Sequence, residues 1–421
     1  MADQRRRIVI VGAGFGGLEA AKALRAAAAD VFVIDQQNHH CFQPLLYQVA
    51  TAALSPADVA WPIRSILRKQ RNATVLMAEV RGIDTAKKLV QTDSISVPYD
   101  VLVLATGATH SYFGHDEWAE VAPGLKRIED ATRIRRRILI AFERAELTSD
   151  EVERRRLLTF VIVGGGATGV EMAGAITEVA RQTLAMDFRR IDPKASRIVL
   201  IEAGPRVMPA LPANLSDYVR DTLTQKGVEV MTATRVTRCD ARGVDLEQGR
   251  IDAATIIWAA GVVASPAARW LDAEHDRAGR VKVGPDLSVA GHPEIFAIGD
   301  TAAAIDGAGR SIPGIAPAAK QMGRYVGRLI AARIAGAPAP APFRYRHQGD
   351  LAAIGRRAAV VKLGRLELRG FLGWLFWSVI HVFFLIEIRD RVIVAFTWLW
   401  DYVTFQRGAR LITRVPPQDK E

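Results

Sequence analysis

Two stretches of the chain place apolar and small residues in the same order. In the first, the apolar run Ile8–Val11 is followed by a group of glycines and then by an alanine-rich segment that reaches Leu24. A short continuous apolar run is typical of a buried parallel strand, and an alanine-rich segment favours a helix. A second apolar run ends on Asp35. The pattern therefore predicts strand, turn, helix and strand, the beginning of a parallel sheet.

The glycines of the first turn have the spacing G-x-G-x-x-G. Gly12 suits a tight turn, Gly14 lets a pyrophosphate approach the backbone, and Gly17 lets the helix pack close to the strand. Free N–H groups and the positive end of the helix dipole would then face the phosphates. Asp35 follows the turn by about 20 positions, where a ribose hydroxyl needs an acceptor. These features predict a dinucleotide site, whereas a glycine turn without a nucleotide is the alternative.

The same pattern returns at residues 158–180. Its glycines are Gly164, Gly166 and Gly169, and the strand that follows carries Glu202. Two complete fingerprints in one chain predict two dinucleotides. A carboxylate at Glu202 would accept from a free 2′-hydroxyl and repel a 2′-phosphate, which favours NADH over NADPH. Glu171 comes early in the second helix, where the dipole stabilises a carboxylate; its functional interpretation is a polar group beside the nicotinamide.

Further apolar runs end in turns of small residues. Residues 99–108 end in an Ala-Thr-Gly turn that contains Thr106 and Gly107, and residues 252–262 end in Ala-Ala-Gly. Residues 293–302 are predicted to contain a strand that ends in Gly299 and Asp300. A carboxylate there can accept from a sugar-alcohol hydroxyl, and the glycine lets the backbone approach. A helix over 317–334 would point its N-terminus toward the cofactor.

The remaining segments divide into connections and a distinct C-terminal part. A charged helix is predicted over 128–145, a polar linker over 150–156 and a hairpin over 351–363. Residues 371–386 are nearly all apolar but fall short of the roughly 20 needed to span a bilayer. A second segment, beginning at Val392, carries Trp398 and Trp400, which favour the headgroup level. The pattern predicts two helices in one leaflet; a buried core helix or a dimer interface is the alternative.

Composition narrows the classes of partner. The net charge of +11 suits nucleic acid or an anionic membrane surface, and no nucleic-acid motif accompanies the scattered basic clusters. Two distant cysteines, Cys41 and Cys239, exclude a disulfide framework and a paired-thiolate metal site. His39 and His40 are too few ligands for a metal, so no metal is expected. The chain has no apolar leader, which predicts a cytoplasmic protein without a secretory signal.

Several motifs together resemble a known family. They are HHCFQPLLYQVAT, IVGGGATGVEMAGAI, IEAGPRVMPALP, FAIGD and APAAKQMG. With the two fingerprints they are similar to type II NADH dehydrogenases, the single-subunit NADH:quinone oxidoreductases of the pyridine nucleotide-disulfide oxidoreductase superfamily. The resemblance covers essentially the whole chain. It implies an α/β fold with two Rossmann-like domains, for FAD and NADH, and a C-terminal membrane-associated helical segment.

The resemblance also implies roles for individual residues. FAD would lie on Gly12, Gly14, Gly17 and Asp35, with Gly299 and Asp300 on its ribitol side. NADH would lie on Gly164, Gly166, Gly169 and Glu202, with Glu171 near the nicotinamide. Gln321 falls in the segment where the family binds quinone, although this chain has Pro317 where that segment usually carries a glutamine.

The expected organisation has five parts. They are a first FAD-binding part (1–115), a connecting helix and linker (116–156), an NADH-binding domain (157–270), a second FAD-binding part (271–344) and a C-terminal membrane-binding region (345–421). The expected enzyme passes electrons from NADH through FAD to a membrane quinone without pumping protons. It would sit peripherally on the cytoplasmic face of the inner cell membrane, contacting anionic lipid through its C-terminal helices, and it could form a homodimer.

Four other functions are alternatives. A disulfide reductase needs a paired-cysteine motif where this chain has Cys41-Phe42-Gln43-Pro44. A sulfide:quinone oxidoreductase needs further cysteines. A single-cysteine thiol or peroxide reductase could use Cys41, although a lone cysteine is also a common small buried residue. A non-respiratory flavoprotein that binds NADH as an effector is the fourth, and slow flavin reduction without quinone turnover would favour it.

Overall fold

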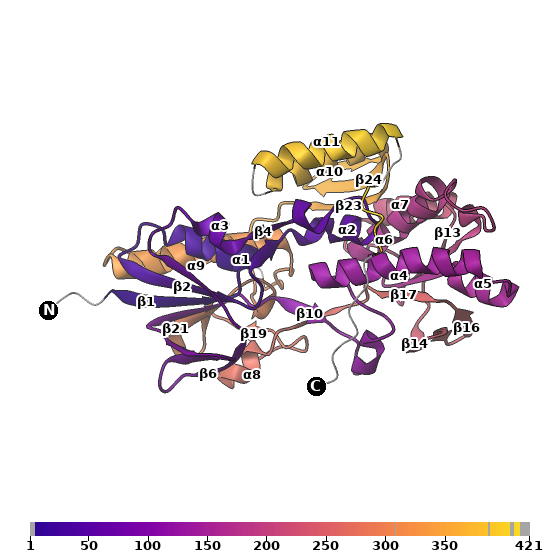
Figure 1. Ribbon diagram of the computed structural model, residues 1–421. Helices are drawn as coiled ribbons and strands as arrows, with labels where there is room; N and C mark the ends of the chain where they lie inside the picture. The colour runs from indigo at the N-terminus through magenta and orange to yellow at the C-terminus, as the bar shows by residue number, and fades with distance from the viewer. Residues whose placement is uncertain (1–4, 308, 386–387, 405–407, 413–421) are drawn as a thin grey trace. The chain divides into compact units, whose positions relative to one another are not determined.

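The computed structural model describes residues 5–307, 309–385, 388–404 and 408–412 (Figure 1). The chain divides into two compact units. The first contains the chain up to Cys41 together with Ala60–Thr109 and Val262–Gln348. The second contains Phe42–Val59, His110–Gly261 and the chain from Gly349 onward. Each unit is built on its own parallel sheet, and each is described separately below. The five-part organisation expected from the sequence stays a prediction.

The first unit is organised around a six-stranded sheet in the order β20-β21-β9-β1-β2-β5. β1 (Arg6–Val11), β2 (Ala29–Asp35), β5 (Ala73–Met77), β9 (Val101–Leu104) and β21 (His292–Ala297) run parallel, and β20 (Ser288–Val289) is antiparallel at the edge. Such strands are apolar along most of their length because both faces of the sheet are covered.

The two faces of this sheet have different covers. Ile8 and Ile10 belong to a core shared with α1 (Phe15–Ala23) and α9 (Ala316–Ile334). Val9 and Val11 belong to a second core on the opposite side, shared with α8 (Ala267–Leu271) and the antiparallel strands β6 (Val80–Asp84), β7 (Leu89–Thr92) and β8 (Ser96–Pro98). This alternation follows from the two-residue period of a strand.

The second unit contains a four-stranded parallel sheet in the order β13-β12-β11-β17. Its strands are β11 (Thr159–Val163), β12 (Arg197–Ile201), β13 (Val228–Met231) and β17 (Thr255–Trp258). α6 (Ala167–Glu178) follows β11 and continues as a single π-helical turn, Val179–Thr183. α4 (Ile128–Leu147) precedes this sheet in the sequence, and α7 (Ala213–Gln225) connects β12 to β13. The α/β class expected from the sequence is confirmed.

One connection differs from its expectation. The polar linker predicted over 150–156 is wrong, because Glu151–Leu157 forms a helix, α5. The carboxylate of Asp150 accepts hydrogen bonds from the backbone N–H groups of Val152 and Glu153, which caps the helix. Arg156 also bonds the carboxylate of Glu153 one turn earlier. A cap and i,i+3 ion pairs therefore make a short helix of a segment that is almost wholly charged.

The C-terminal part of the second unit begins with an antiparallel sheet. The predicted hairpin is confirmed as β23 (Asp350–Gly355) and β24 (Ala358–Leu363), and β25 (Leu366–Arg369) adds a third strand. Two helices follow, α10 (Gly370–Phe384) and α11 (Ile388–Thr404), drawn in yellow tones in Figure 1. Among the described residues, no helix combines the length and the apolar character that crossing a membrane requires. The last expected residues of this region, 413–421, lie outside the described residues.

Candidate functional site

The first glycine turn is closed by contacts that no larger residue could make. A Cβ added to Gly12, whose φ is +99°, would lie 2.3 Å from the carbonyl oxygen of Ala105. A Cβ on Gly17 would lie 1.8 Å from the carbonyl oxygen of Gly12. Around Gly14, in contrast, no described atom other than those of Gly14 and its two chain neighbours lies within 4 Å of such a Cβ. Two of the three glycines are therefore required by the fold, and the third leaves open space in front of the helix.

That open space has the properties of a pyrophosphate site. Gly14 is the N-cap residue of α1, and no side chain of the described residues caps this helix end. Its N–H groups and dipole are therefore available to an anion. The carboxylate of Asp35 accepts hydrogen bonds from the N–H groups of Ala13 (2.6 Å) and Gln37 (2.8 Å). It thus orders the turn from the end of β2, where a ribose would lie. The residues present fit the ADP half of FAD.

The Ala-Thr-Gly turn is tied to the residues after β21. Thr106 shares hydroxyl hydrogen bonds with Ser265 and with Thr301 (3.1 Å), and the N–H of Gly107 donates to the Thr301 hydroxyl at 2.9 Å. Thr301 directly follows the Gly299-Asp300 pair. The structure therefore brings two of the sequence-predicted segments together through Thr301 and Ser265, which the sequence did not single out. For Thr301, its place directly after Asp300 was the signal that could have found it.

The second glycine turn repeats the geometry of the first. Gly164 has φ +110°, and a Cβ on Gly169 would lie 1.8 Å from the carbonyl oxygen of Gly164. A Cβ on Gly166, the N-cap of α6, would have no described atom within 4 Å other than those of Gly166 and its chain neighbours, and no described side chain caps this helix end. The carboxylate of Glu202 accepts from the N–H groups of Gly165 and Gly204, both at 2.6 Å. The residues fit a second dinucleotide.

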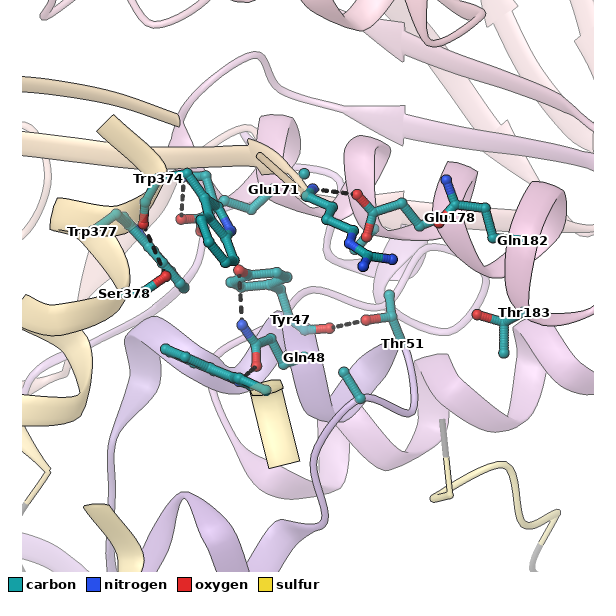
Figure 2. A pocket seen from close by; sticks show the side chains of 16 residues that line it. Tyr47, Gln48, Thr51, Glu171, Glu178, Gln182, Thr183, Trp374, Trp377 and Ser378 are labelled. Carbon is teal, nitrogen blue, oxygen red and sulfur yellow. Dashed lines mark hydrogen bonds between the residues drawn. The ribbon is translucent and has the colours of Figure 1, made fainter. Parts of the chain in front are cut away.

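A pocket lies within the second unit, and Figure 2 shows its side chains. About 800 Å³ lies between its walls, part of it open to solvent. Its residues come from α2 (Leu46–Ala50) and the loop after it, α6 with its π-helical turn, β23, α10 and α11. They are Tyr47, Gln48, Thr51, Ala53, Glu171, Ala175, Glu178, Gln182, Thr183, Ala353, Gly355, Arg356, Trp374, Trp377, Ser378 and Trp398.

Glycines explain how β23 comes close to α6. A Cβ on Gly174 would lie 2.0 Å from the carbonyl oxygen of Ile354, so only glycine permits this approach of strand to helix. At the other end, Gly355 has φ +140°, and a Cβ there would lie 2.5 Å from the carboxylate of Glu178. Glu178 in turn forms an ion pair with Lys226 at 3.6 Å. This end of the pocket is polar, whereas tryptophans line the other.

Glu171 stands on the wall of this pocket. One of its carboxyl oxygens accepts a hydrogen bond of 3.3 Å from the N–H of Ala353, and burial raises the pKa of the group to about 8. Desolvation disfavours the charged form, and a single long hydrogen bond compensates little of that cost. Glu171 therefore holds a proton at neutral pH. It can donate a hydrogen bond or give up the proton to a ligand in the pocket.

Gln48 links α2 to the last helix. Its amide N–H donates to the Tyr47 hydroxyl at 3.0 Å, and its carbonyl accepts from the Nε1–H of Trp398 at 2.8 Å. The sequence predicts Trp398 at the headgroup level beside Trp400. Instead, the indole of Trp398 is half-buried and bonded inside the second unit, whereas Trp400 is exposed. Gln48 was missed because nothing in its local sequence distinguishes it from a helix surface residue.

The other candidates have structural surroundings of their own. The amide of Gln321 is paired in both directions with the backbone of Arg346, at 2.9 and 3.0 Å, so its role at quinone stays a prediction. His40 is buried, its ring bonds the carbonyl of Ala13, and burial lowers its pKa to about 4. Burial raises the pKa of Cys239 to about 12, so that thiol stays protonated. The described residues contain no cluster of metal ligands.

Comparison with known proteins decides the family. Residues 6–323 match the family model described as "Pyridine nucleotide-disulphide oxidoreductase", and residues 347–406 match "NDH2 C-terminal domain". The chain is 44% identical to the Type II NADH:quinone oxidoreductase Ndh of Mycobacterium tuberculosis, over 97% of this chain and 91% of that protein. The chain belongs to the type II NADH:quinone oxidoreductases of the pyridine nucleotide-disulphide oxidoreductase family. A Type II NADH:quinone oxidoreductase of Staphylococcus haemolyticus is 30% identical, with 86% and 90% covered.

Solved structures agree with this family at the level of the fold. NDH2 of Plasmodium falciparum, solved in complex with NADH, superposes with a TM-score of 0.86 at 21% identity, covering 97% of this chain and 100% of that chain. The sulfide:quinone oxidoreductase of Aquifex aeolicus superposes with a TM-score of 0.72 at 17% identity, with 92% of each chain covered. Since both identities are low, they show a shared architecture and nothing about chemistry. The resemblance to type II NADH dehydrogenases is confirmed by the family models and the more similar relatives.

Proposed function

We propose that the chain oxidises NADH with FAD as its bound cofactor and passes two electrons to a quinone, without pumping protons. The observation that carries this proposal is the pair of glycine turns, each open at its central glycine and each ordered by a carboxylate, Asp35 in one unit and Glu202 in the other. Both relatives above carry the name NADH:quinone oxidoreductase. FAD, when bound, takes a hydride from NADH and gives electrons to the acceptor.

The residues have distinct tasks in this proposal. Gly12, Gly14, Gly17 and Asp35 bind the ADP half of FAD, while Thr106, Gly107, Gly299 and Asp300 border its flavin side. Gly164, Gly166, Gly169 and Glu202 bind the ADP half of NADH. A carboxylate already bonded within the turn, as Glu202 is, would repel a 2′-phosphate, so NADPH binds more weakly. The protein contributes binding and orientation here, since hydride transfer needs no protein acid at the carbon centre.

The pocket of the second unit suits the quinone. Reduction of a quinone to a quinol takes two electrons and two protons, and hydride transfer supplies only one proton. Glu171, whose pKa is raised to about 8, holds a proton at the pocket wall and would supply the second. Tryptophans at one end offer apolar surface to a ring, and the opposite end is polar. This pocket is preferred to Gln321, whose amide is already paired.

The two last helices offer an apolar surface to a membrane. On α10, Leu372, Val379 and Phe383, and on α11, Val392, Phe396 and Leu399, are each 60–65% exposed. Six large apolar side chains in contact with water mark an interaction surface. A quinone with an isoprenoid tail is found in the bilayer, so this surface is proposed to rest on the membrane at its cytoplasmic face. A homodimer that covers the same surface is the competing proposal.

Stopped-flow absorbance of the flavin tests the function. The FAD-loaded protein is mixed with NADH, then with a soluble short-chain quinone, and the series is repeated with NADPH. Fast bleaching by NADH and recovery of colour on adding quinone are expected, with slower bleaching by NADPH. Bleaching without recovery would contradict the quinone as acceptor. Slow bleaching together with no recovery would favour a flavoprotein that binds NADH as an effector.

A further inference from the structure

Trp377 is the most deeply buried large side chain of the pocket wall. It is 2% exposed, it stands on α10, and it lines the pocket. Its ring is stacked on that of His381 at a centroid distance of 4.1 Å and on that of Trp398 at 5.4 Å, with interplanar angles of 27° and 26°. Stacking engages the faces of an aromatic ring, and an indole N–H lies in the ring plane. The polar group of the Trp377 side chain, its Nε1–H, therefore lies on the edge of the ring and not on a stacked face.

That edge carries a donor without an acceptor. The Nε1–H of Trp377 is buried, and it makes no hydrogen bond with any residue that the structure describes. The Nε1–H of Trp398, in the same stack, bonds the carbonyl of Gln48 at 2.8 Å. Buried indole N–H groups normally find a partner, because leaving one unpaired costs stability. A buried orphan donor beside a pocket is explained when the acceptor belongs to a ligand.

The neighbours of Trp377 do not supply that acceptor. Burial lowers the pKa of His381 to about 4, so its ring is neutral, and its Nδ1 bonds the carbonyl of Trp377 at 2.8 Å. A carbonyl accepts, so Nδ1 carries the proton. The Tyr47 ring centroid lies 6.4 Å from that of Trp377, and the Tyr47 hydroxyl accepts from Gln48. The stack thus holds the indole rigidly and leaves its N–H unpaired among the described residues.

We infer that the Nε1–H of Trp377 donates a hydrogen bond to a carbonyl oxygen of the quinone headgroup, making Trp377 a substrate-binding residue of the pocket. This inference rests on the proposed function. A 1,4-quinone has two carbonyl oxygens, and two donors belong to side chains that line the pocket, the protonated carboxyl of Glu171 and the indole of Trp377 (Figure 2). An unpaired buried N–H costs free energy in the protein without ligand. A quinone carbonyl that accepts from this N–H would remove that cost, which favours binding.

The test compares Trp377→Phe with Trp118→Phe in the FAD-loaded protein. Phenylalanine keeps an aromatic ring and removes only the N–H and the second ring. Trp118 is the matched control because it too is buried and stacked on a histidine, His115 at 4.3 Å, but does not line the pocket. The KM for 2-methyl-1,4-naphthoquinone is expected to rise about three- to tenfold in Trp377→Phe and to stay unchanged in Trp118→Phe. The rate of flavin reduction by NADH should be the same in all three proteins.

A binding measurement without turnover separates the hydrogen bond from packing. Thermal stabilisation of the oxidised protein is titrated with 2-methyl-1,4-naphthoquinone and with 2-methylnaphthalene, which has the same ring system and no carbonyl. Trp377→Phe should weaken binding of the quinone about three- to tenfold more than binding of the hydrocarbon. Equal weakening of both ligands, or no weakening, would overturn the inference. Wild-type protein whose reduced flavin is not reoxidised by the quinone would instead overturn the proposed function, so the two failures are distinguishable.

Discussion

The carboxylate of Glu202 accepts a hydrogen bond of 2.6 Å from the backbone N–H of Gly165, inside the second glycine turn. Its other oxygen accepts from the N–H of Gly204 at the same distance. In the first unit Asp35 holds Ala13 in the corresponding way. An acid at the end of the second strand therefore does two things. It orders the turn proposed to receive the pyrophosphate, and its negative charge is proposed to repel a 2′-phosphate.

Replacement of Glu202 by glutamine should reduce the preference for NADH. Glutamine keeps one oxygen acceptor but loses the charge that repels a 2′-phosphate. We expect the rate of flavin reduction at low NADH to fall roughly tenfold, because an ordered turn loses a charge-assisted bond, while the rate with NADPH falls less or rises. Stopped-flow measurement of flavin reduction with NADH and with NADPH gives the ratio of the two rates. Glu247→Gln, at an exposed position of the same unit, is the control. An unchanged ratio would contradict the role of Glu202.

Alanine at Gly17 should impair folding, whereas alanine at Gly14 should impair the binding of FAD. A Cβ at Gly17 would stand 1.8 Å from a carbonyl oxygen, so Gly17→Ala should destabilise the protein by roughly 3 kcal/mol. A Cβ at Gly14 meets no described atom within 4 Å beyond its chain neighbours, so Gly14→Ala should fold normally. It should nevertheless lose FAD, because the methyl group stands where the pyrophosphate approaches. Urea unfolding and the flavin-to-protein absorbance ratio separate the two effects. Gly14→Ala protein that retains full flavin would refute the proposed cradle.

Aspartate at both Phe396 and Leu399 should release the protein from lipid. Both side chains are exposed on α11. Two apolar side chains of this size contribute several kcal/mol to membrane binding when the lipid buries them. Binding to anionic vesicles should fall by about tenfold or more in a flotation assay. Met186→Asp removes another strongly exposed apolar side chain of the same unit and should bind as wild type does. If the double variant instead turns a dimer into a monomer and binds vesicles normally, the surface is a subunit interface.

Serine at Cys41 should leave NADH:quinone turnover within about twofold of wild type. Cys41 lies in the short strand β3 (His39–Cys41), and the second cysteine, Cys239, belongs to the other unit and is buried. Dithiol chemistry needs two neighbouring thiols, and the unit that contains Cys41 has no second cysteine. Steady-state assays with quinone, peroxide and a disulfide measure the three possible acceptors. Loss of turnover in Cys41→Ser would revive the single-cysteine reductase.

The nucleotide turns could be predicted from the sequence because the elements that define them follow one another along the chain. Strand, glycines, helix and terminal acid lie between Arg6 and Asp35 in the first unit and between Thr159 and Glu202 in the second, although Gly12 and Gly164 also contact Ala105 and Ala259 from a later strand end. The contact of Gly17 with Gly12, in contrast, falls inside the first of these spans. The fold class followed from the repetition of the same unit. Even the departure at 150–156 was local, since the capping by Asp150 decides it and charge alone does not.

The pocket could not be predicted in the same way. Its walls come from distant segments, and each has an ordinary local explanation: α2 as a short helix, α10 as an apolar helix, and α11 as an interfacial one. What joins them is long-range, such as the hydrogen bond from Trp398 to Gln48. The orphan N–H of Trp377 is defined only by what surrounds it. Glu171 was singled out by its position after the glycine turn, but its raised pKa depends on the pocket.

Glutamine at Glu171 should change the pH dependence of both turnover and stability. The carboxyl has a pKa of about 8 in the folded protein against 4.5 for the ordinary side chain. Below pH 4.5 the carboxyl is protonated in both the folded and the unfolded protein, so it adds no pH dependence to the stability. Between that pH and about 8 the unfolded chain has lost the proton and the folded protein still holds it, so wild-type stability falls as pH rises. Relative to wild type, Glu171→Gln should gain stability across this range and show a constant difference above it. Urea unfolding over this pH range measures the difference.

Turnover should follow the same proton. The quinone-dependent step of the wild type is expected to slow as pH rises above about 8, where Glu171 loses the proton that it donates. In Glu171→Gln this step should be about a hundredfold slower and independent of pH in that range, while flavin reduction by NADH keeps its rate. Glu178→Gln is the matched control, since Glu178 lines the same pocket but is ion-paired with Lys226. Reoxidation of flavin, followed by stopped flow on both sides of this pKa, measures the step. A wild-type profile that is flat across the pKa, or a Glu171→Gln variant with the wild-type profile, would show that the proton comes from elsewhere.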